Sequence, residues 1–355
     1  MAPETLTDPL LRAGIRVACR RRLARVGRGG VEAQQARQES WLEELRASPV
    51  AIETLAANRQ HYEVAPELFR LILGPRLKYS CCLWSDGVGS LAEAEEAMLA
   101  LSCRRAGVED GMEILDLGCG WGSLSGWLAE SYPSSRILAV SNSARQRSTI
   151  EALGFGNVEV VTADANSFEP HRRFDRVLSI EMMEHTRNWE TLLERIASWL
   201  DPDGRLFVHV FSHHRHAYPY ERGWMARNFF SGGQMPSHEL LPRFERHLGV
   251  EESWVVSGCH YEQTANAWLG NLDANRAAVK RLVGLAGYWR WRAFLLSCAE
   301  LWGYGGGTEW QVSHYRLAHR FRLAARPEPC DADAQVPNPS GRAAPGGARL
   351  PDRAL

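Results

Sequence analysis

Apolar residues follow two alternating spacings through the middle of the chain. Short apolar runs of strand length are separated by segments in which apolar residues recur every three or four positions, as on one face of a helix. The short runs predict strands at 112–117, 136–141, 157–162, 174–180 and 204–211. The other segments predict helices at 123–131, 143–153 and 187–200. This alternation predicts a doubly wound, mostly parallel α/β sheet that binds ligands at the carboxyl ends of its strands.

The flanking segments predict a helical arm before this core and a cap after it. Residues 1–60 and about 91–106 have helical spacing, and seven arginines from Arg12 to Arg28 form a stripe that we interpret as a solvated helix face. Segments 250–257 and 309–318 alternate like antiparallel strands. Two amphipathic helices are expected between them, at 264–282 and 288–302, where they would cover a pocket.

We therefore divide the chain into four parts. They are a helical arm with a covering loop (1–90), a ligand-binding core (91–211), a substrate-binding cap with the final strands (212–325) and a tail (326–355). The tail consists largely of Pro, Gly, Ala and Arg, so its composition predicts disorder.

Composition narrows the class of protein. The 355 residues carry a formal net charge of −1, so no overall field draws the chain to nucleic acid or anionic lipid. No apolar segment approaches the roughly 18 uninterrupted residues of a membrane span. The eight cysteines form no CxxC pair, which excludes the usual zinc spacing. We expect a cytoplasmic enzyme with reduced thiols, no nucleic-acid partner and no transmembrane segment.

A glycine loop follows the first predicted strand. Asp116 ends the apolar run, and Gly118 and Gly120 lie before the next helix. Glycines at such a turn let a ligand lie against bare backbone at the start of a helix. The spacing is GxGxG and not the GxGxxG of a dinucleotide site. Together with the strand order, it indicates an S-adenosylmethionine site, with Gly118 and Gly120 at the amino-acid part of the cofactor and Asp116 near its ammonium.

The ends of the next three strands supply the remaining cofactor contacts. No acid follows the second strand, which argues against a nicotinamide cofactor, and Asn142 and Gln146 are expected to bond the ribose hydroxyls as neutral groups. At the third strand end, Asp164 would accept from the adenine amino group, with Ala165 under the ring. Ile180 ends the fourth strand and is expected to line the site.

Seven short motifs resemble one family in their order along residues 10–320. They are Lys78–Cys82, Leu115–Gly122, Ala139–Ser143, Glu181–His185, Phe229–Ser237, His260–Thr264 and Glu300–Tyr304. The chain resembles the cyclopropane fatty acid synthase superfamily of methyltransferases, especially its coclaurine N-methyltransferase-like branch. This resemblance implies a class I methyltransferase (Rossmann-like) fold with an N-terminal helical arm and a helical cap. It also implies that Tyr79 and Ser80 contact the cofactor.

The segment from Glu181 to His185 contains the candidate catalytic groups. The spacings i, i+3 and i+4 bring Glu181, Glu184 and His185 to one side if the segment is helical. An amine acceptor is mostly protonated at neutral pH, so a carboxylate or imidazole must hold the cation and take its proton. The alternative is a solvated helix turn whose acids complement the helix dipole. We expect these three groups to orient and deprotonate the acceptor, with Tyr261 helping to position it.

The competing acceptor is the double bond of an unsaturated acyl chain. Cyclopropane synthases use a bound bicarbonate there, and the resemblance assigns it to positions matching Cys81, Glu184, His209 and Tyr261, with a reactive-site cysteine at Cys298. Glu181 favours the amine, because cyclopropane synthases tend to carry a small uncharged residue at that position. A second carboxylate beside an acyl chain would also be buried without a partner, at a cost of roughly several kcal/mol. The cap motifs resemble the N-methyltransferases more closely.

Three further alternatives carry less support in the sequence. A catalytically inactive binding protein would be expected to have a damaged cofactor loop or acid cluster, and neither is damaged. No metal is expected, because the leaving group of methyl transfer is a neutral thioether that needs no Lewis acid. Methylation of nucleic acid would call for basic residues interleaved with aromatics near the site. The predicted partner is a small-molecule amine, and a homodimer is compatible with the sequence.

Overall fold

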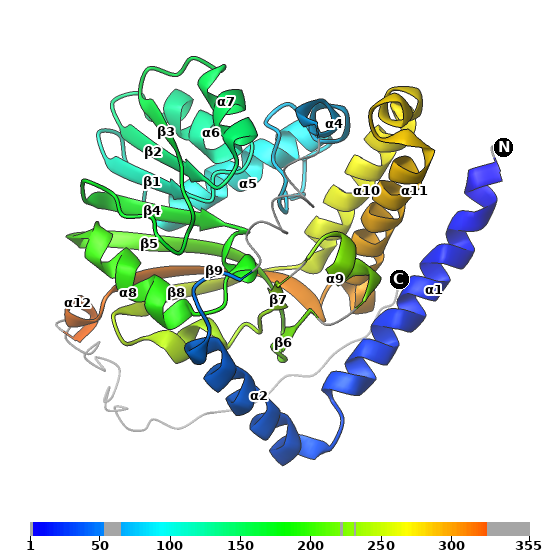
Figure 1. Cartoon of the computed structure of the whole chain (residues 1–355), viewed down its shortest axis with the longest axis horizontal. Helices are drawn as coiled ribbons and strands as arrows, with labels where there is room; N and C mark the ends of the chain where they lie inside the picture. The colour runs from blue at the N-terminus through cyan, green and yellow to red at the C-terminus, as the bar shows by residue number, and fades with distance from the viewer. Residues whose placement is uncertain (1–2, 53–64, 221–222, 231, 325–355) are drawn as a thin grey trace, which may run out of the picture.

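The computed structural model describes residues 3–52, 65–220, 223–230 and 232–324. The predicted tail (326–355) and Ser231 of the Phe229–Ser237 motif lie outside these residues. Figure 1 shows a sheet covered by helices on both faces, with a helical cap beside it and a long N-terminal helix along the cap.

Within the described residues, the main sheet has seven strands in the order β3-β2-β1-β4-β5-β9-β8. Their bounds are β1 (Glu113–Leu117), β2 (Arg136–Ser141), β3 (Val158–Thr162), β4 (Phe174–Ile180), β5 (Leu200–His213), β8 (Leu248–Val256) and β9 (Trp310–His319). The first five pair in parallel, whereas β9 runs antiparallel to both β5 and β8. This arrangement confirms the predicted doubly wound α/β fold. The chain reverses its direction of winding beside β1, which is where ligands bind in such sheets.

Alternation along β1 explains how both faces of the sheet become buried. Ile114 packs with α5 and α6 on one face, whereas Leu115 and Leu117 pack with α8 and α2 on the other. The helices around the sheet are α2 (Gly30–Ala47), α5 (Leu91–Ala106), α6 (Ser123–Ser131), α7 (Ala144–Glu151) and α8 (Trp189–Trp199). Asp116 therefore projects toward α6, where Ser125 donates to it.

The start of β5 departs from the expected turn. The predicted helix (187–200) and strand (204–211) leave residues 201–203 as a connection, but β5 already begins at Leu200. Phe174 pairs with Leu200 and Arg176 with Arg205, so the intervening residues of β5 bulge out of the ladder. The Pro-Asp-Gly sequence is accommodated within this irregular pairing rather than before the strand.

The cap consists of helices packed over the carboxyl edge of the sheet. It contains α4 (Pro66–Ile72), α9 (Trp224–Asn228), α10 (Gly258–Ala274) and α11 (Arg276–Trp302), with the small strands β6 (Tyr218–Pro219) and β7 (Gln234–Met235). The predicted helix break near 283–287 is confirmed, because the chain leaves helical geometry at Gly284, whose φ is 73° and ψ 174°. A second break, between Ala274 and Arg276, was not predicted. A short helix, α12 (Arg320–Ala324), follows β9.

The N-terminal helix α1 (Pro3–Val26) lies along α11 (Figure 1). Glu300 is buried on α11 and accepts from Arg12, with 2.7 Å between Nη1 and Oε1, and from Arg16. The interpretation of the arginine stripe as a solvated face was therefore wrong for Arg12, which is 26% exposed. This ion pair also accounts for Glu300 in the Glu300–Tyr304 motif, because a buried carboxylate needs a partner.

Candidate active site

Three cavities meet at the carboxyl edge of the parallel strands, and Glu181 lines all three. The first cavity spans about 930 Å³ and lies beside the ends of β1 and β2. The second, of about 550 Å³, lies between the glycine loop and the Lys78–Cys82 segment. The third, of about 730 Å³, lies under the helical cap. We call the first two together the cofactor cavity and the third the acceptor pocket.

The glycine loop forms the floor of the cofactor cavity. Gly118 and Gly120 line both of its parts and have φ values of 87° and 53°, which favour glycine. A Cβ atom on Gly118 would come within 2.6 Å of Met182, whereas one on Gly120 would meet nothing within 4 Å and would project into free space. Gly118 is thus required by packing, and Gly120 leaves the backbone open to a ligand.

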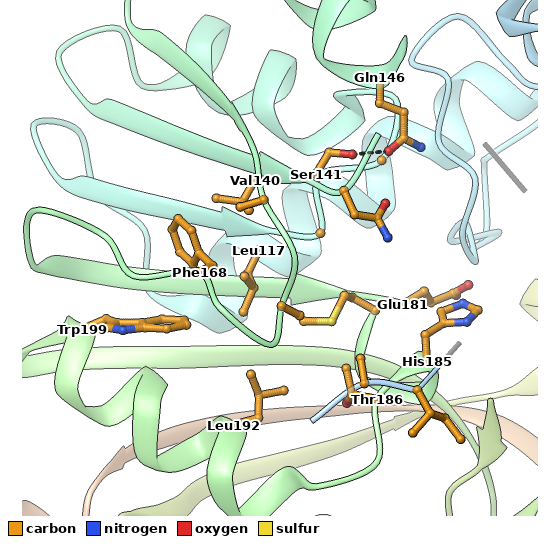
Figure 2. A pocket seen from close by; sticks show the side chains of 18 residues that line it. Leu117, Val140, Ser141, Gln146, Phe168, Glu181, His185, Thr186, Leu192 and Trp199 are labelled. Carbon is orange, nitrogen blue, oxygen red and sulfur yellow. Dashed lines mark hydrogen bonds between the residues drawn. The ribbon is translucent and has the colours of Figure 1, made fainter. Parts of the chain in front are cut away.

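Gln146 presents an unused donor to both parts of the cofactor cavity. Its Oε1 accepts from the hydroxyl of Ser141, as Figure 2 shows, and the side chain is 2% exposed. Among the described residues, its Nε2 finds no hydrogen-bond partner. Asn142 lines the same cavity. A buried amide donor without a partner fits a ligand that presents hydroxyl oxygens, as the predicted ribose contact requires.

Asp116 lines the cofactor cavity with its carboxyl group buried. Burial raises the pKa of Asp116 to about 7, although a 2.6 Å hydrogen bond from Ser125 Oγ lowers it in part. The Trp121 Nε1 and Ser123 Oγ atoms beside it are buried, and neither finds a hydrogen-bond partner among the described residues. An incoming cation would favour the ionised form of Asp116, as expected for the ammonium of an amino-acid ligand.

Four of the remaining predicted cofactor residues also line the cofactor cavity. Tyr79, Ser80 and Ile180 line the part beside the Lys78–Cys82 segment, and Ala165 lines the part near β2. Asp164 is not among the residues that line either part, and its Oδ1 accepts from the backbone and side chain of Asn166. The structure brings the other nine predicted cofactor residues to one cavity. Their roles, and that of Asp164, stay predictions.

An apolar end of the cofactor cavity went unnoticed in the sequence. Figure 2 shows Phe168 and Trp199 at this end, whereas Glu181 and His185 lie at the other. The two aromatic rings meet edge to face at 5.3 Å. Phe168 lies in the loop after β3 and Trp199 ends α8 just before β5, so no pattern in the sequence associates them. Such a surface suits the flat face of an aromatic base.

The segment after β4 is not the helix that its spacing suggested. Glu181 has a φ of 46°, which is rare for a residue other than glycine, and only Met183–His185 form a short 3-10 helix. The alternative of a solvated helix turn was also wrong, because Glu181 and Glu184 are 8% and 1% exposed. The left-handed turn instead directs Glu181, Glu184 and His185 to the acceptor pocket. Strained backbone of this kind is concentrated at functional sites.

The Glu181 carboxylate is held by three donors from three segments. The Cys81 amide donates to Oε1 over 2.9 Å, His209 Nε2 lies 3.2 Å from Oε1, and the Tyr261 hydroxyl donates to Oε2 over 2.6 Å. Burial raises the pKa of Glu181, while the charge of Lys78 and the Cys81 and Tyr261 hydrogen bonds lower it. These donors make Glu181 the member of the buried acid pair that carries the negative charge.

Glu184 lies in the same pocket without any such support. Neither carboxylate oxygen finds a hydrogen-bond partner among the described residues. Burial raises the pKa of Glu184 well above its ordinary value, and the negative charge of Glu181 raises it further. A buried carboxyl group with two unused acceptor oxygens is a site for a ligand that brings its own positive charge and donors.

His185 and Cys298 complete the predicted catalytic set in the acceptor pocket. Burial lowers the pKa of His185 to about 4, so its imidazole is neutral at physiological pH, and the ring stacks on Phe230 at 5.8 Å. Burial raises the pKa of the Cys298 thiol, and the charge of Glu181 adds to this effect. A thiol in this setting stays protonated and is a poor nucleophile.

The Lys78–Cys82 segment connects the core to the cap. Glu95 on α5 accepts from the backbone of Gly74, Arg76 and Lys78, which fixes the start of this segment. The Cys82 amide then donates to Thr264 Oγ1 on α10 over 3.1 Å. Farther along, the Trp84 amide lies 3.1 Å from His260 Nδ1. These bonds connect the Lys78–Cys82 motif to the His260–Thr264 motif, so α10 anchors the segment that presents Cys81 to Glu181.

The aromatic walls of the acceptor pocket come from the cap. The Tyr261 ring stacks on Trp302, with centroids 4.6 Å apart and planes within 4° of parallel, and Phe230 stacks on Tyr220 at 5.1 Å. His213, the last residue of β5, lines none of the three cavities. It is buried, and its Nδ1 accepts from the backbone of Arg215 and His216. Through Nδ1, His213 therefore fixes the turn that follows β5.

Comparison with known proteins places these features in a family. The family model described as mycolic acid cyclopropane synthetase matches residues 51–311. The chain is 36% identical over 327 residues to (S)-coclaurine N-methyltransferase of Thalictrum flavum subsp. glaucum, which covers 86% of this chain and 91% of that protein. It is 29% identical to cyclopropane-fatty-acyl-phospholipid synthase of Escherichia coli K12, over 59% of this chain and 54% of that protein.

A solved structure agrees with this result. The crystal structure of a coclaurine N-methyltransferase bound to N-methylheliamine and SAH superposes with a TM-score of 0.83 at 35% sequence identity, covering 86% of this chain and 94% of that one. These findings confirm the resemblance inferred from the sequence motifs. No helix in the described part of the chain combines the length and apolarity of a membrane span.

Proposed function

The chain belongs to the mycolic acid cyclopropane synthetase family, and on that premise we propose that it is an S-adenosylmethionine-dependent N-methyltransferase of a small aromatic or alkaloid-like amine. The N-methyltransferase relatives support this choice, because they match more of the chain, at higher identity, than the cyclopropane synthase does. The decision between an amine and an alkene acceptor depends on the surroundings of Glu181.

One observation carries the proposal: a carboxylate of the chain itself occupies the donors that the competing reaction needs. The resemblance to cyclopropane synthases assigns bicarbonate to Cys81, Glu184, His209 and Tyr261. In this protein the Cys81 amide, His209 and Tyr261 all contact the Glu181 carboxylate. A bicarbonate ion would have to compete for the same donors beside an existing negative charge. The arrangement supports an acceptor that is a cation over one that is an uncharged double bond.

The cofactor cavity has groups that fit S-adenosylmethionine. The free space at Gly120 suits the part of the cofactor that lies against backbone. The unused donor of Gln146 suits its hydroxyl groups, and the buried acid Asp116 suits its ammonium group. The apolar end at Phe168 and Trp199 suits its base. When bound, S-adenosylmethionine supplies a methyl group made electrophilic by positive sulfur.

In this proposal Glu184 takes the proton of the amine. An ordinary carboxyl group, with a pKa near 4, would hold an ammonium ion as a salt and leave its proton in place. Burial and the charge of Glu181 raise the pKa of Glu184, which brings it closer to that of an amine and makes the transfer easier. The positive charge of the bound ammonium favours the ionised form of Glu184, which releases its own proton to solvent as the cation enters. The proton of the amine nitrogen then moves to a Glu184 oxygen, and the nitrogen lone pair becomes free.

Glu181 and the aromatic walls hold the acceptor in position. The Glu181 carboxylate stays ionised and offsets the positive charge in the pocket, while neutral His185 and Tyr261 orient the ring and nitrogen. Tyr220 and Phe230 offer aromatic faces to the cation and to a planar ring. We also propose a cytosolic location, which is supported by the seven free cysteines among the described residues.

The test offers both acceptor classes to the purified protein. S-adenosylmethionine carrying a labelled methyl group is incubated with benzylic and isoquinoline amines, and in parallel with vesicles of unsaturated phospholipid. Label recovered in an N-methylated amine supports the proposal. Label recovered as a methylene group in the acyl chain would overturn it and would require a bicarbonate to displace Glu181 from its donors.

A further inference from the structure

Four side chains form a line of hydrogen bonds from the end of α5 to the Glu181 carboxylate. Arg105 Nη1 lies 2.7 Å from His314 Nδ1, and His314 Nε2 lies 2.9 Å from His209 Nδ1. His209 Nε2 then lies 3.2 Å from Glu181 Oε1. Both histidines are fully buried, whereas Arg105 is only partly buried at the far end.

The register of the sheet creates this line. His209 on β5 is paired with Ile180, the residue before Glu181, on one side and with His314 on β9 on the other. His314 is paired in turn with Trp254 on β8, and the Arg105 guanidinium lies 4.9 Å from the centre of that indole ring. Three neighbouring strands therefore bring the side chains together, although the four residues are distant in sequence.

The direction of every hydrogen bond in this line follows from Arg105, which is able only to donate. Arginine has only N–H donors, so His314 Nδ1 must accept from Arg105. A neutral histidine has one donor and one acceptor nitrogen, so His314 Nε2–H donates to His209 Nδ1 and His209 Nε2–H donates to Glu181. Burial lowers the pKa of both histidines well below the ordinary value, which agrees with neutral rings.

We propose that Arg105 and His314 are positioning residues, which fix His209 as an Nε2–H donor and thereby keep Glu181 ionised for the acceptor. Without Arg105, His314 is able to carry its proton on Nδ1 and accept from His209. The bare Nε2 of His209 would then face Glu181, and the carboxyl group would have to be protonated to bond with it. Arg105, which lines neither the cofactor cavity nor the acceptor pocket, would in this way set the charge of the acceptor pocket.

The other groups facing Glu181 remain in place when Arg105 is changed. The titratable and charged side chains around it are Lys78, Cys81, Glu184, His185, Tyr261 and Cys298. None of them bonds to Arg105 or His314 in the described structure, so a change at Arg105 tests the histidine line separately from them.

The kinetic experiment compares Arg105→Met with two other variants over a range of pH. The kinetic assay rests on the proposed N-methylation. We expect Arg105→Met to move the acidic limb of kcat/KM up by about one pH unit, with a loss of about tenfold on that limb and little change at high pH. Arg105→Lys keeps a donor and should restore most of the wild-type profile. Arg104→Met removes the same charge from an exposed neighbouring residue and should keep that profile.

A second measurement does not depend on activity. Nitrogen-15 NMR of histidine-labelled protein reports which ring nitrogen carries the proton, and single substitutions of His209 and His314 assign their signals. We expect both residues to be Nε2–H in the wild type and at least one to change in Arg105→Met. This readout distinguishes failure of the inference from failure of the proposed function, since it needs no acceptor. Unchanged tautomers, or an equal loss of kcat/KM at every pH, would overturn the inference.

Discussion

The cofactor cavity and the acceptor pocket share Glu181 but are built in different ways. Besides the shared Glu181, the cofactor cavity uses backbone at Gly118 and Gly120, a neutral amide at Gln146 and an acid at Asp116. These groups lie at successive strand ends, and each is positioned by its own strand and the turn after it. A sequence pattern predicts such a site because the parallel sheet brings consecutive strand ends together.

The acceptor pocket instead concentrates buried ionisable groups from distant segments. Its chemistry depends on Glu181 having three donors and Glu184 having none among the described residues. Two identical carboxyl groups three residues apart therefore differ in charge, one as a fixed anion and the other as a group able to exchange a proton. The comparison teaches that hydrogen-bond partners, rather than residue type, assign their roles.

The largest expected effect separates the two regions at Glu184. We expect Glu184→Gln to lower kcat by about 10²–10⁴-fold, because an amide has a similar shape but cannot accept the amine proton. The dissociation constant of the cofactor, measured by calorimetry, should stay at the wild-type value, since Glu184 lines only the acceptor pocket. Glu194→Gln, at a position that is 60% exposed, is the matched control and should leave both quantities unchanged. A fully active Glu184→Gln enzyme would exclude this residue as the base.

A second experiment removes the carboxylate shared by both regions. Glu181→Ala leaves the Cys81 amide, His209 and Tyr261 without their acceptor, and we expect turnover to fall by about 10²–10³-fold. Added formate should restore part of that activity by binding these donors, and it should not accelerate the wild type. Loss of activity without any rescue, in a protein that still melts cooperatively, would argue that Glu181 does more than supply a charge.

A third prediction concerns the acid of the cofactor cavity. The pKa of Asp116 is raised from 3.8 to about 7, so the native state holds a proton that the unfolded chain has released between these values. The free energy of unfolding should consequently fall as pH rises through this window, by on the order of 4 kcal/mol from this group. Asp116→Asn should lack that decrease in denaturant titrations of the cofactor-free protein. An unchanged pH dependence in the variant would assign the slope to other groups.

The same residue links cofactor affinity to pH. Because a bound ammonium favours ionised Asp116, affinity should increase as pH rises toward 7 and level off above it. Calorimetry in two buffers of different ionisation enthalpy would detect the proton that is released on binding below pH 7. Proton release that persists in Asp116→Asn would contradict this assignment.

The smallest expected effect is at Gln146. We expect Gln146→Leu to weaken cofactor binding by about tenfold, because the Nε2 donor is lost from a buried site, with kcat unchanged at saturating cofactor. Gln263→Leu, on the exposed side of α10, should keep wild-type affinity. A lower kcat at saturation in Gln146→Leu would indicate that the two regions are coupled through more than Glu181.

The sequence alone determined the fold and most of the cofactor cavity. Short apolar runs located β1 to β5 within a few residues, and the glycine loop, Asn142, Gln146 and Ala165 all line the predicted cavity. These features are local, because a strand and the turn after it are specified by adjacent residues. Helix ends in the cap were less predictable: the break at Gly284 falls within the predicted interval, whereas the break at Asn275, whose side-chain amide donates to Leu71 O on α4, was not predicted.

Only the tertiary structure decided the chemistry of the acceptor pocket. Helical spacing correctly grouped Glu181 with Glu184 and His185, but for the wrong reason, since a left-handed turn brings them together. Nothing near Glu181 in sequence reveals that Cys81, His209 and Tyr261 donate to it, or that Arg105 lies behind His209. Charge and proton affinity in a buried site depend on neighbours brought together by the sheet register and the cap, and those neighbours lie up to about 200 residues apart.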